Sequence, residues 1–120
     1  MKVRQRSRRI HAVALAGLFV GIAVCLAHPA RAADEEAARA LARQSNCFKC
    51  HAVDKKKEAP PWREVAAKYK GDPNAEAKLI HHITSGEKVK FEDGHEEEHK
   101  IVMSKDPAQI KNLVDWILSL

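Results

Sequence analysis

The stretch CFKCH at residues 47–51 decides how this chain is interpreted, because it places two thiols three residues apart with an imidazole directly after them. The sequence has three cysteines, and Cys25 lies within an apolar run near the N-terminus. A disulfide between Cys47 and Cys50 would close a very short loop, and the entropic effect of a crosslink grows with loop length. A small domain around these cysteines therefore needs something else to fill its core.

The positive charge of the chain belongs to its N-terminal segment. The formal net charge is +5, but six of the 21 Lys and Arg residues lie in residues 1–32, which contain no Asp or Glu. Residues 33–120 contain the other 15 cations and all 16 acidic residues. A nucleic-acid-binding protein is therefore not indicated, because the basic charge is not on the folded domain.

Residues 1–32 have the layout of a secretory signal peptide. A cationic start precedes an apolar run over residues 10–27, and Ala30-Arg31-Ala32 supplies the small residues of a cleavage site. We expect cleavage near Ala32 or Ala33, which leaves residues 33–120 as one exported, periplasmic domain without a membrane span. The alternative is a membrane anchor retained through residues 10–27, although a run of this length is at the short end for a spanning helix.

Capping residues and apolar spacing predict helices and no strands in the exported part. The first helix covers residues 34–44, and the second begins at Trp62 and stops at Gly71. Asp72-Pro73 and Asp106-Pro107 each combine an N-cap with a proline suited to the first helical turn. They predict a third helix that ends near Gly86 and an amphipathic terminal helix. Residues 87–103 are expected to form a polar loop.

The predicted fold is all-α, with about four short helices and too few large apolar side chains for its length. A bulky apolar ligand at its centre would fill this core. The attachment sequence of a c-type haem is C-x-x-C-H, and residues 47–51 match it. Cys47 and Cys50 can each bond one vinyl group of the same porphyrin, and His51 then lies over the iron. One covalently bound haem c is the cofactor that this motif predicts.

Two other readings of the cysteine pair fit less well. A thioredoxin-like redox pair needs a strand before it, and here the pair follows a helix. A structural zinc site would need a second pair of ligands at a suitable spacing.

The chain resembles the small class I cytochromes c, in particular the short bacterial cytochromes c551 and c552. The likeness spans nearly all of residues 33–120. It rests on the helix before Cys47, on the attachment segment, on Pro60 with the Trp62 segment after it, on the third helix up to Gly86, and on the terminal helix with Trp116. The resemblance implies a small cytochrome c fold wrapped around one haem, in which the first and last helices cross near Trp116.

The resemblance also implies roles for individual residues. The carbonyl of Pro60 should accept a hydrogen bond from Nδ1 of His51 and orient the imidazole. Met103 should be the second axial ligand of the iron, a ligand that raises the reduction potential. Packing around the haem is expected from apolar side chains spread along the chain: Trp62, Leu79, Ile83, Phe91 and Leu113.

The sixth ligand leaves alternatives open, because Met103 lacks the prolines that usually flank it in the family. His95 and His99 precede it in the loop and are rival ligands, and a core methionine that fills a gap is a further reading of Met103. His81 and His82 lie on a predicted helix and are expected at the surface. Residues 95–99 also match the H-E-x-x-H zinc motif, which in so charged a loop is interpreted as a chance match.

The function implied is a monohaem electron carrier and not an enzyme. The expected partners are redox proteins: a quinol-oxidising complex, a terminal oxidase or a periplasmic oxidoreductase. Several lysines flank the haem segments and could steer an acidic partner, or they could serve solubility alone. We expect a monomer or a weak complex. The alternatives are a haem c subunit of an oxidoreductase complex, and a bis-histidine or ligand-binding haem protein.

Overall fold

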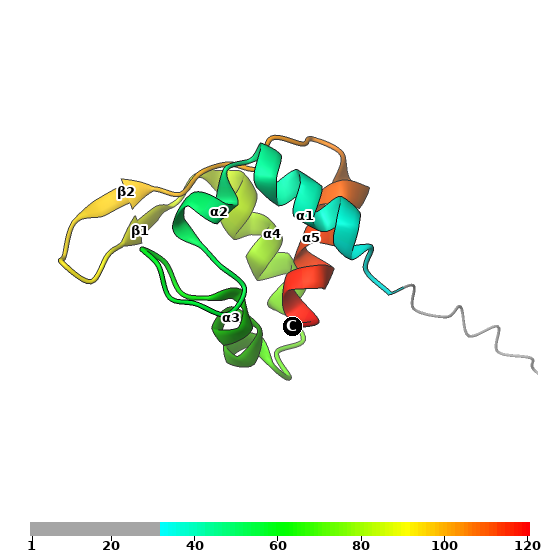
Figure 1. Cartoon of the computed structure of the whole chain (residues 1–120), viewed down its shortest axis with the longest axis horizontal. Helices are drawn as coiled ribbons and strands as arrows, with labels where there is room; N and C mark the ends of the chain where they lie inside the picture. The colour runs from blue at the N-terminus through cyan, green and yellow to red at the C-terminus, as the bar shows by residue number, and fades with distance from the viewer. Residues whose placement is uncertain (1–31) are drawn as a thin grey trace, which may run out of the picture.

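The computed structural model describes residues 32–120 of the chain. The predicted signal segment up to residue 31, including the candidate anchor at residues 10–27, lies outside the described residues. In the described part, five helices and a two-stranded sheet follow one another (Figure 1). The mostly helical fold that the sequence predicts is therefore confirmed.

Helix α1 (Glu35–Gln44) and helix α5 (Pro107–Leu118) are packed against each other. Asp34 caps α1, where its side chain accepts a hydrogen bond from the Ala37 N–H at 3.0 Å, and Asp106 caps α5 in the same way. The side chain of Asn112 bonds both the N–H and the carbonyl of Asp34, at 2.7 Å and 2.8 Å. The start of α1 is thus fixed to the middle of α5.

Helix α2 (Cys47–Cys50) is a single turn formed by the cysteine motif itself, and it raises the helix number above the predicted four. Helix α3 (Trp62–Tyr69) lies where the sequence predicts it. Helix α4 (Ala75–Ser85) begins later than predicted. The Asp72 carboxylate accepts a hydrogen bond from the Asn74 N–H at 2.8 Å and stabilises a turn, so the helix starts only after that turn.

The prediction that residues 87–103 form a loop without strands is wrong in part. Strand β1 (Lys88–Lys90) pairs antiparallel with strand β2 (Glu96–Glu98), with Lys88 opposite Glu98 and Lys90 opposite Glu96. Opposite charges across the pair stabilise the hairpin modestly. The sequence does not reveal it, because Val89 is the only β-branched residue in either strand.

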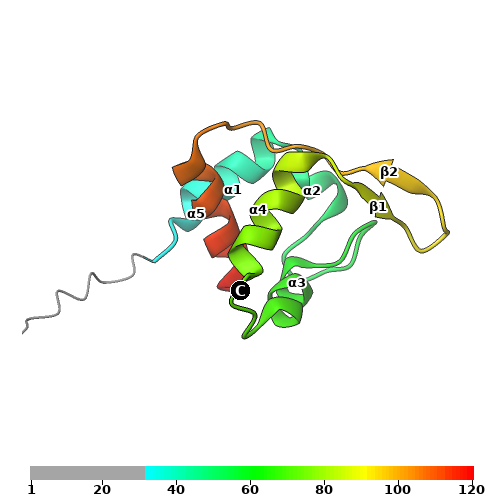
Figure 2. The ribbon, with the colours of Figure 1, turned by 180° about the vertical axis from the view of Figure 1, so that it is seen from behind.

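The hairpin projects from one end of the molecule, and the start of α1 lies at the other end (Figures 1 and 2). Gly86 ends α4 with a positive φ of 67°, which lets the chain turn from the helix into β1. The loop that joins α2 to α3 reaches toward the hairpin, where Lys56 forms an ion pair with Glu92.

The core forms around α5, which packs against α1, α3 and α4. Leu113 and Val114 of α5 are almost fully buried, and each contributes about 1.5–3 kcal/mol through removal of its side chain from water. Ala38 and Ala42 are also fully buried, and their small side chains let α5 approach α1 closely. Trp116 is buried at this contact, as predicted, and Arg39 lies 4.8 Å from the centre of its ring.

Within residues 32–120, the helices are too short or too polar to cross a lipid bilayer.

Candidate haem-binding site

The two cysteines of α2 share one helical turn and are free thiols. Asn46 precedes the turn in the left-handed region, with φ of 58°, a conformation that asparagine tolerates better than most residues. Burial raises the pKa of the Cys47 thiol. Burial and the neighbouring Glu58 carboxylate raise the pKa of Cys50. Both sulfurs are therefore held as thiols close together, as attachment to two vinyl groups of one porphyrin requires.

His51 follows the turn in extended conformation. Its Nδ1 lies 2.8 Å from the carbonyl oxygen of Pro60, which is the contact that the resemblance implies. Because a carbonyl can only accept, Nδ1 carries the proton and Nε2 keeps a free lone pair. Burial lowers the pKa of His51, and the Pro60 carbonyl opposes this effect. A neutral imidazole with a free Nε2 is the form that binds iron.

The indole of Trp62 lies against the His51 ring, with centroids 5.6 Å apart and planes 20° apart. The backbone N–H of Trp62 donates to the Ala52 carbonyl, and the backbone N–H of Ala59 donates to the Cys50 carbonyl. The segment from the attachment turn to the start of α3 therefore folds back on itself, which brings Pro60 to His51.

Met103 lies after the hairpin and before α5, and its side chain is 71% exposed. Its backbone N–H donates to Oγ of Ser45 at 3.0 Å. The residue before it, Val102, is buried, and its N–H donates to the Ile83 carbonyl at 2.9 Å. The backbone at Met103 is thus fixed on two sides although its side chain is not packed.

The structure separates the two rival histidines. His95 is exposed on the hairpin, where it contacts Asp93 and stacks on Phe91 with ring centroids 4.3 Å apart. His99 is half-buried, and its ring centroid lies 6.3 Å from that of His51. Its Nδ1 is buried without a hydrogen-bond partner, and burial lowers its pKa to about 4. Of the two, only His99 is near the attachment segment.

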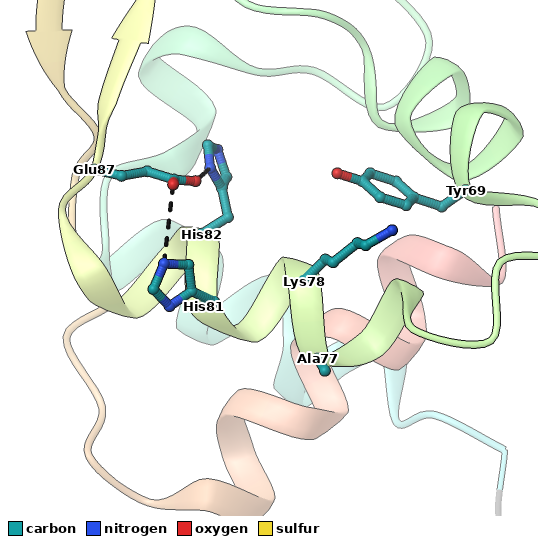
Figure 3. Close-up of a pocket in the computed structure, with 6 residues that line it drawn as sticks. All are labelled: Tyr69, Ala77, Lys78, His81, His82 and Glu87. Carbon is teal, nitrogen blue, oxygen red and sulfur yellow. Dashed lines mark hydrogen bonds and ion pairs between the residues drawn. The ribbon is translucent and has the colours of Figure 1, made fainter.

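The prediction that His82 lies at the surface is wrong in part, because this residue is half-buried and its ring centroid lies 4.1 Å from that of His99. Both His81 and His82 are directed at Glu87, and Tyr69 and Lys78 face them across a cavity of about 430 Å³ (Figure 3). Sequence reasoning missed this cluster, because no spacing pattern marks which histidine of a helix or loop turns inward.

The packing residues predicted for the haem divide into two groups. Trp62, Leu79 and Leu113 are buried in the core, and Ile83 packs against it. Phe91 lies outside the core, in the hairpin, where it stacks on His95. The histidines of the H-E-x-x-H match flank a strand and not a helix, and the described residues contain no group of three or more side chains placed to hold a metal ion.

The free thiol pair, the oriented imidazole and the unpaired nitrogen of His99 fit a haem c beside α2. The cytochrome c family model matches residues 35–120. The chain belongs to the cytochrome c family. Its small cytochrome c fold and its one covalently bound haem c, both expected from the sequence, are confirmed by this membership.

This cytochrome is similar to proteins of several bacteria. It is 36% identical over 94 residues to cytochrome c-551 of Pseudomonas aeruginosa, a match that covers 78% of this chain and 84% of that protein. Among solved structures, the class 1 cytochrome MtoD of Sideroxydans lithotrophicus is 65% identical, with a TM-score of 0.70 and coverage of 73% and 97%. Cytochrome c552 of Nitrosomonas europaea is 30% identical, with a TM-score of 0.56 and coverage of 68% and 98%.

Like the cytochromes that it matches, this protein is a small electron carrier. The haem supplies one-electron chemistry, in which the iron cycles between the ferrous and ferric states. Of the residues described above, Cys47 and Cys50 would hold the haem, and the Pro60 carbonyl would orient His51 toward the iron.

Proposed function

We propose that this cytochrome is an exported one-electron carrier whose haem is joined to Cys47 and Cys50 and whose iron is held between His51 and Met103. The observation that carries the proposal is the 2.8 Å contact between His51 Nδ1 and the Pro60 carbonyl. It fixes the tautomer of the imidazole and leaves Nε2 for the iron.

The exposure of Met103 supports its role as the sixth ligand. A methionine that fills a gap in the core would be buried, whereas this side chain is 71% exposed beside a buried Val102. Its backbone N–H is held by Ser45, two residues before Cys47, so the backbone of Met103 lies near the attachment turn. A soft, neutral thioether favours ferrous iron and raises the reduction potential.

Ligation by two side chains leaves no open position on the iron. Such a haem exchanges electrons through its edge and does not bind small molecules at the metal. This property distinguishes an electron carrier from a haem sensor or a ligand-binding haem protein.

His99 is the second candidate for the sixth ligand, since its ring lies 6.3 Å from that of His51. The near-infrared spectrum of the ferric protein separates the two. We expect the methionine-to-iron charge-transfer band in the wild-type protein and in a His99→Asn variant, and its absence in Met103→Ala. A wild-type protein without this band, in which His99→Asn changes the low-spin spectrum, would establish His99 as the ligand.

Carbon monoxide provides an independent test of six-coordination. We expect the Soret band of the ferrous wild-type protein to change slowly and incompletely on mixing, and that of Met103→Ala to change rapidly. A rapid and complete change in the wild type would contradict the proposed ligation.

We further propose that residues 1–32 direct export and are removed near Ala32 or Ala33, so that the cytochrome works in the periplasm. The likeness of residues 1–32 to a signal peptide supports this, and so does the haem attachment motif. Periplasmic recovery of a protein with one haem and an N-terminus at Ala33 or Asp34 would agree with it. A membrane fraction that retains residues 10–27 would favour the anchored alternative.

The proposed partners are redox proteins, of the quinol-oxidising, terminal oxidase or periplasmic oxidoreductase classes. Exposed lysines of the loop at residues 55–57 lie beside the attachment segment and could steer an acidic partner. The rate of electron exchange with such a partner should fall as ionic strength rises. Elution of the cytochrome at a fixed stoichiometry with an oxidoreductase would instead identify it as a subunit.

A further inference from the structure

Ser45 is the one buried polar residue among residues 32–120, with a relative exposure of 4%. It ends α1, where its N–H donates to the Leu41 carbonyl at 2.9 Å. A polar group in the interior costs free energy unless it forms a hydrogen bond. The partner that the buried hydroxyl finds therefore indicates what this residue does.

That partner is the backbone of the proposed iron ligand. Oγ of Ser45 accepts a hydrogen bond from the Met103 N–H at 3.0 Å, across 58 positions of sequence. The next N–H upstream, that of Val102, donates to the carbonyl of Ile83 in α4. Two consecutive N–H groups are therefore fixed on two different helices, α1 and α4.

The side chain of Met103 has no comparable support from the protein. It is 71% exposed and does not belong to the hydrophobic core. Methionine is also unbranched and flexible, so its own rotamers do not fix the position of the sulfur. The position of the thioether must therefore be set through the backbone.

We propose that Ser45 is a positioning residue for the sixth ligand. Its hydroxyl holds the Met103 backbone beside the attachment turn, so that the thioether stays on the iron and resists displacement by external ligands. The inference rests on the proposed ligation by Met103 and adds to it the element that maintains that ligation.

Amide hydrogen exchange of the ferrous holoprotein tests the contact directly. We expect the Met103 N–H to be protected in the wild type and to exchange much faster in Ser45→Ala, while the Val102 N–H stays protected in both. An unprotected Met103 N–H in the wild type would overturn the proposal, and so would equal protection in the two proteins.

Displacement of the thioether by imidazole in the ferric holoprotein tests the consequence. Ser45→Ala removes the partner of the part-buried Met103 N–H, so the backbone beside the thioether is held less firmly. We therefore expect imidazole to displace the ligand at about tenfold lower concentration in Ser45→Ala, a factor that corresponds to about 1.4 kcal/mol. The fading of the charge-transfer band reports the displacement.

Two control variants separate this effect from general destabilisation. Ser119→Ala removes a hydroxyl that bonds the Trp116 carbonyl, far from Met103 in sequence. Ile110→Val shortens a buried core side chain and lowers the stability of the fold. Both should need the same imidazole concentration as the wild type. If Ile110→Val shifts the titration as much as Ser45→Ala does, Ser45 acts through overall stability and the proposal is wrong.

The wild-type spectrum keeps the two hypotheses apart. If the charge-transfer band is absent from the wild type, ligation by Met103 is wrong and the proposal about Ser45 falls with it. If the band is present and Ser45→Ala titrates like the wild type, ligation stands and only the role of Ser45 is refuted.

Discussion

The two proposed iron ligands, His51 and Met103, are held in different ways. On the His51 side, the imidazole is held by the Pro60 carbonyl, nine residues later, within one folded-back segment. On the Met103 side, a side-chain hydroxyl holds a backbone N–H across 58 positions. A backbone carbonyl survives any substitution, whereas one substitution deletes a hydroxyl. The first side is therefore local and robust, and the second is assembled by the tertiary fold and is easily altered.

We expect the largest effect when the covalent attachment of the haem, on which both ligands depend, is removed. In the Cys47→Ala/Cys50→Ala variant the haem is no longer covalently held, and the core loses its central component. We expect the purified polypeptide without haem to have little helical content and no cooperative melting by circular dichroism. Helicity equal to that of the holoprotein would show that α1, α4 and α5 fold without the haem.

The next effect is confined to the Met103 side. Met103→Ala should lower the reduction potential by about 100 mV or more, because axial ligands set haem potentials over a wide range. A redox titration measures it, and His95→Asn is the matched control, since His95 lies on the exposed hairpin. An unchanged potential in Met103→Ala would mean that this residue does not bind the iron.

A smaller effect is expected on the His51 side. Pro60→Ala keeps the carbonyl that accepts from His51, so the spectrum should not change. The free energy of unfolding should fall by about 0.5–1 kcal/mol, because the unfolded chain gains freedom when a proline is removed. Denaturant titration of the holoprotein measures this change. A spectral change would show that the proline ring itself, and not only its carbonyl, orients the imidazole.

The smallest effect concerns neither ligand. Lys56 and Glu92 form an ion pair between the attachment loop and the hairpin, but both side chains are well exposed. Exposed pairs of this kind contribute little to stability, and salt screens them. Lys56→Ala should therefore change the denaturation midpoint little, and the difference should vanish at high salt. A large loss that persists at high salt would show that the loop and the hairpin are coupled more strongly than their exposure indicates.

Sequence patterns that depend on a few adjacent residues predicted the structure well. Asp106-Pro107 opens α5, and Gly86 ends α4, because each capping interaction depends on a few adjacent residues. The haem motif is local in the same sense. The start of α4 predicted from Asp72-Pro73 was wrong, because the Asp72 side chain stabilises a turn before the helix instead of capping the helix itself.

Features with a long-range cause were not predictable. A serine ahead of a cysteine motif carries no signal that it will be buried against residue 103. The run at residues 95–99 likewise does not reveal that His99 turns inward and His95 outward, because that choice depends on the hairpin register. The Met103 side of the site was thus open to prediction only through resemblance, whereas the His51 side could be inferred from the residues.

The charges of the hairpin bear on how the molecule behaves at high concentration. Its sheet has only two strands, so each strand has an outer edge that another chain could pair with. All three residues of β2 are exposed glutamates, and two copies that met through their β2 edges would place like charges opposite one another. Pairing of two hairpins through β2 is thereby disfavoured.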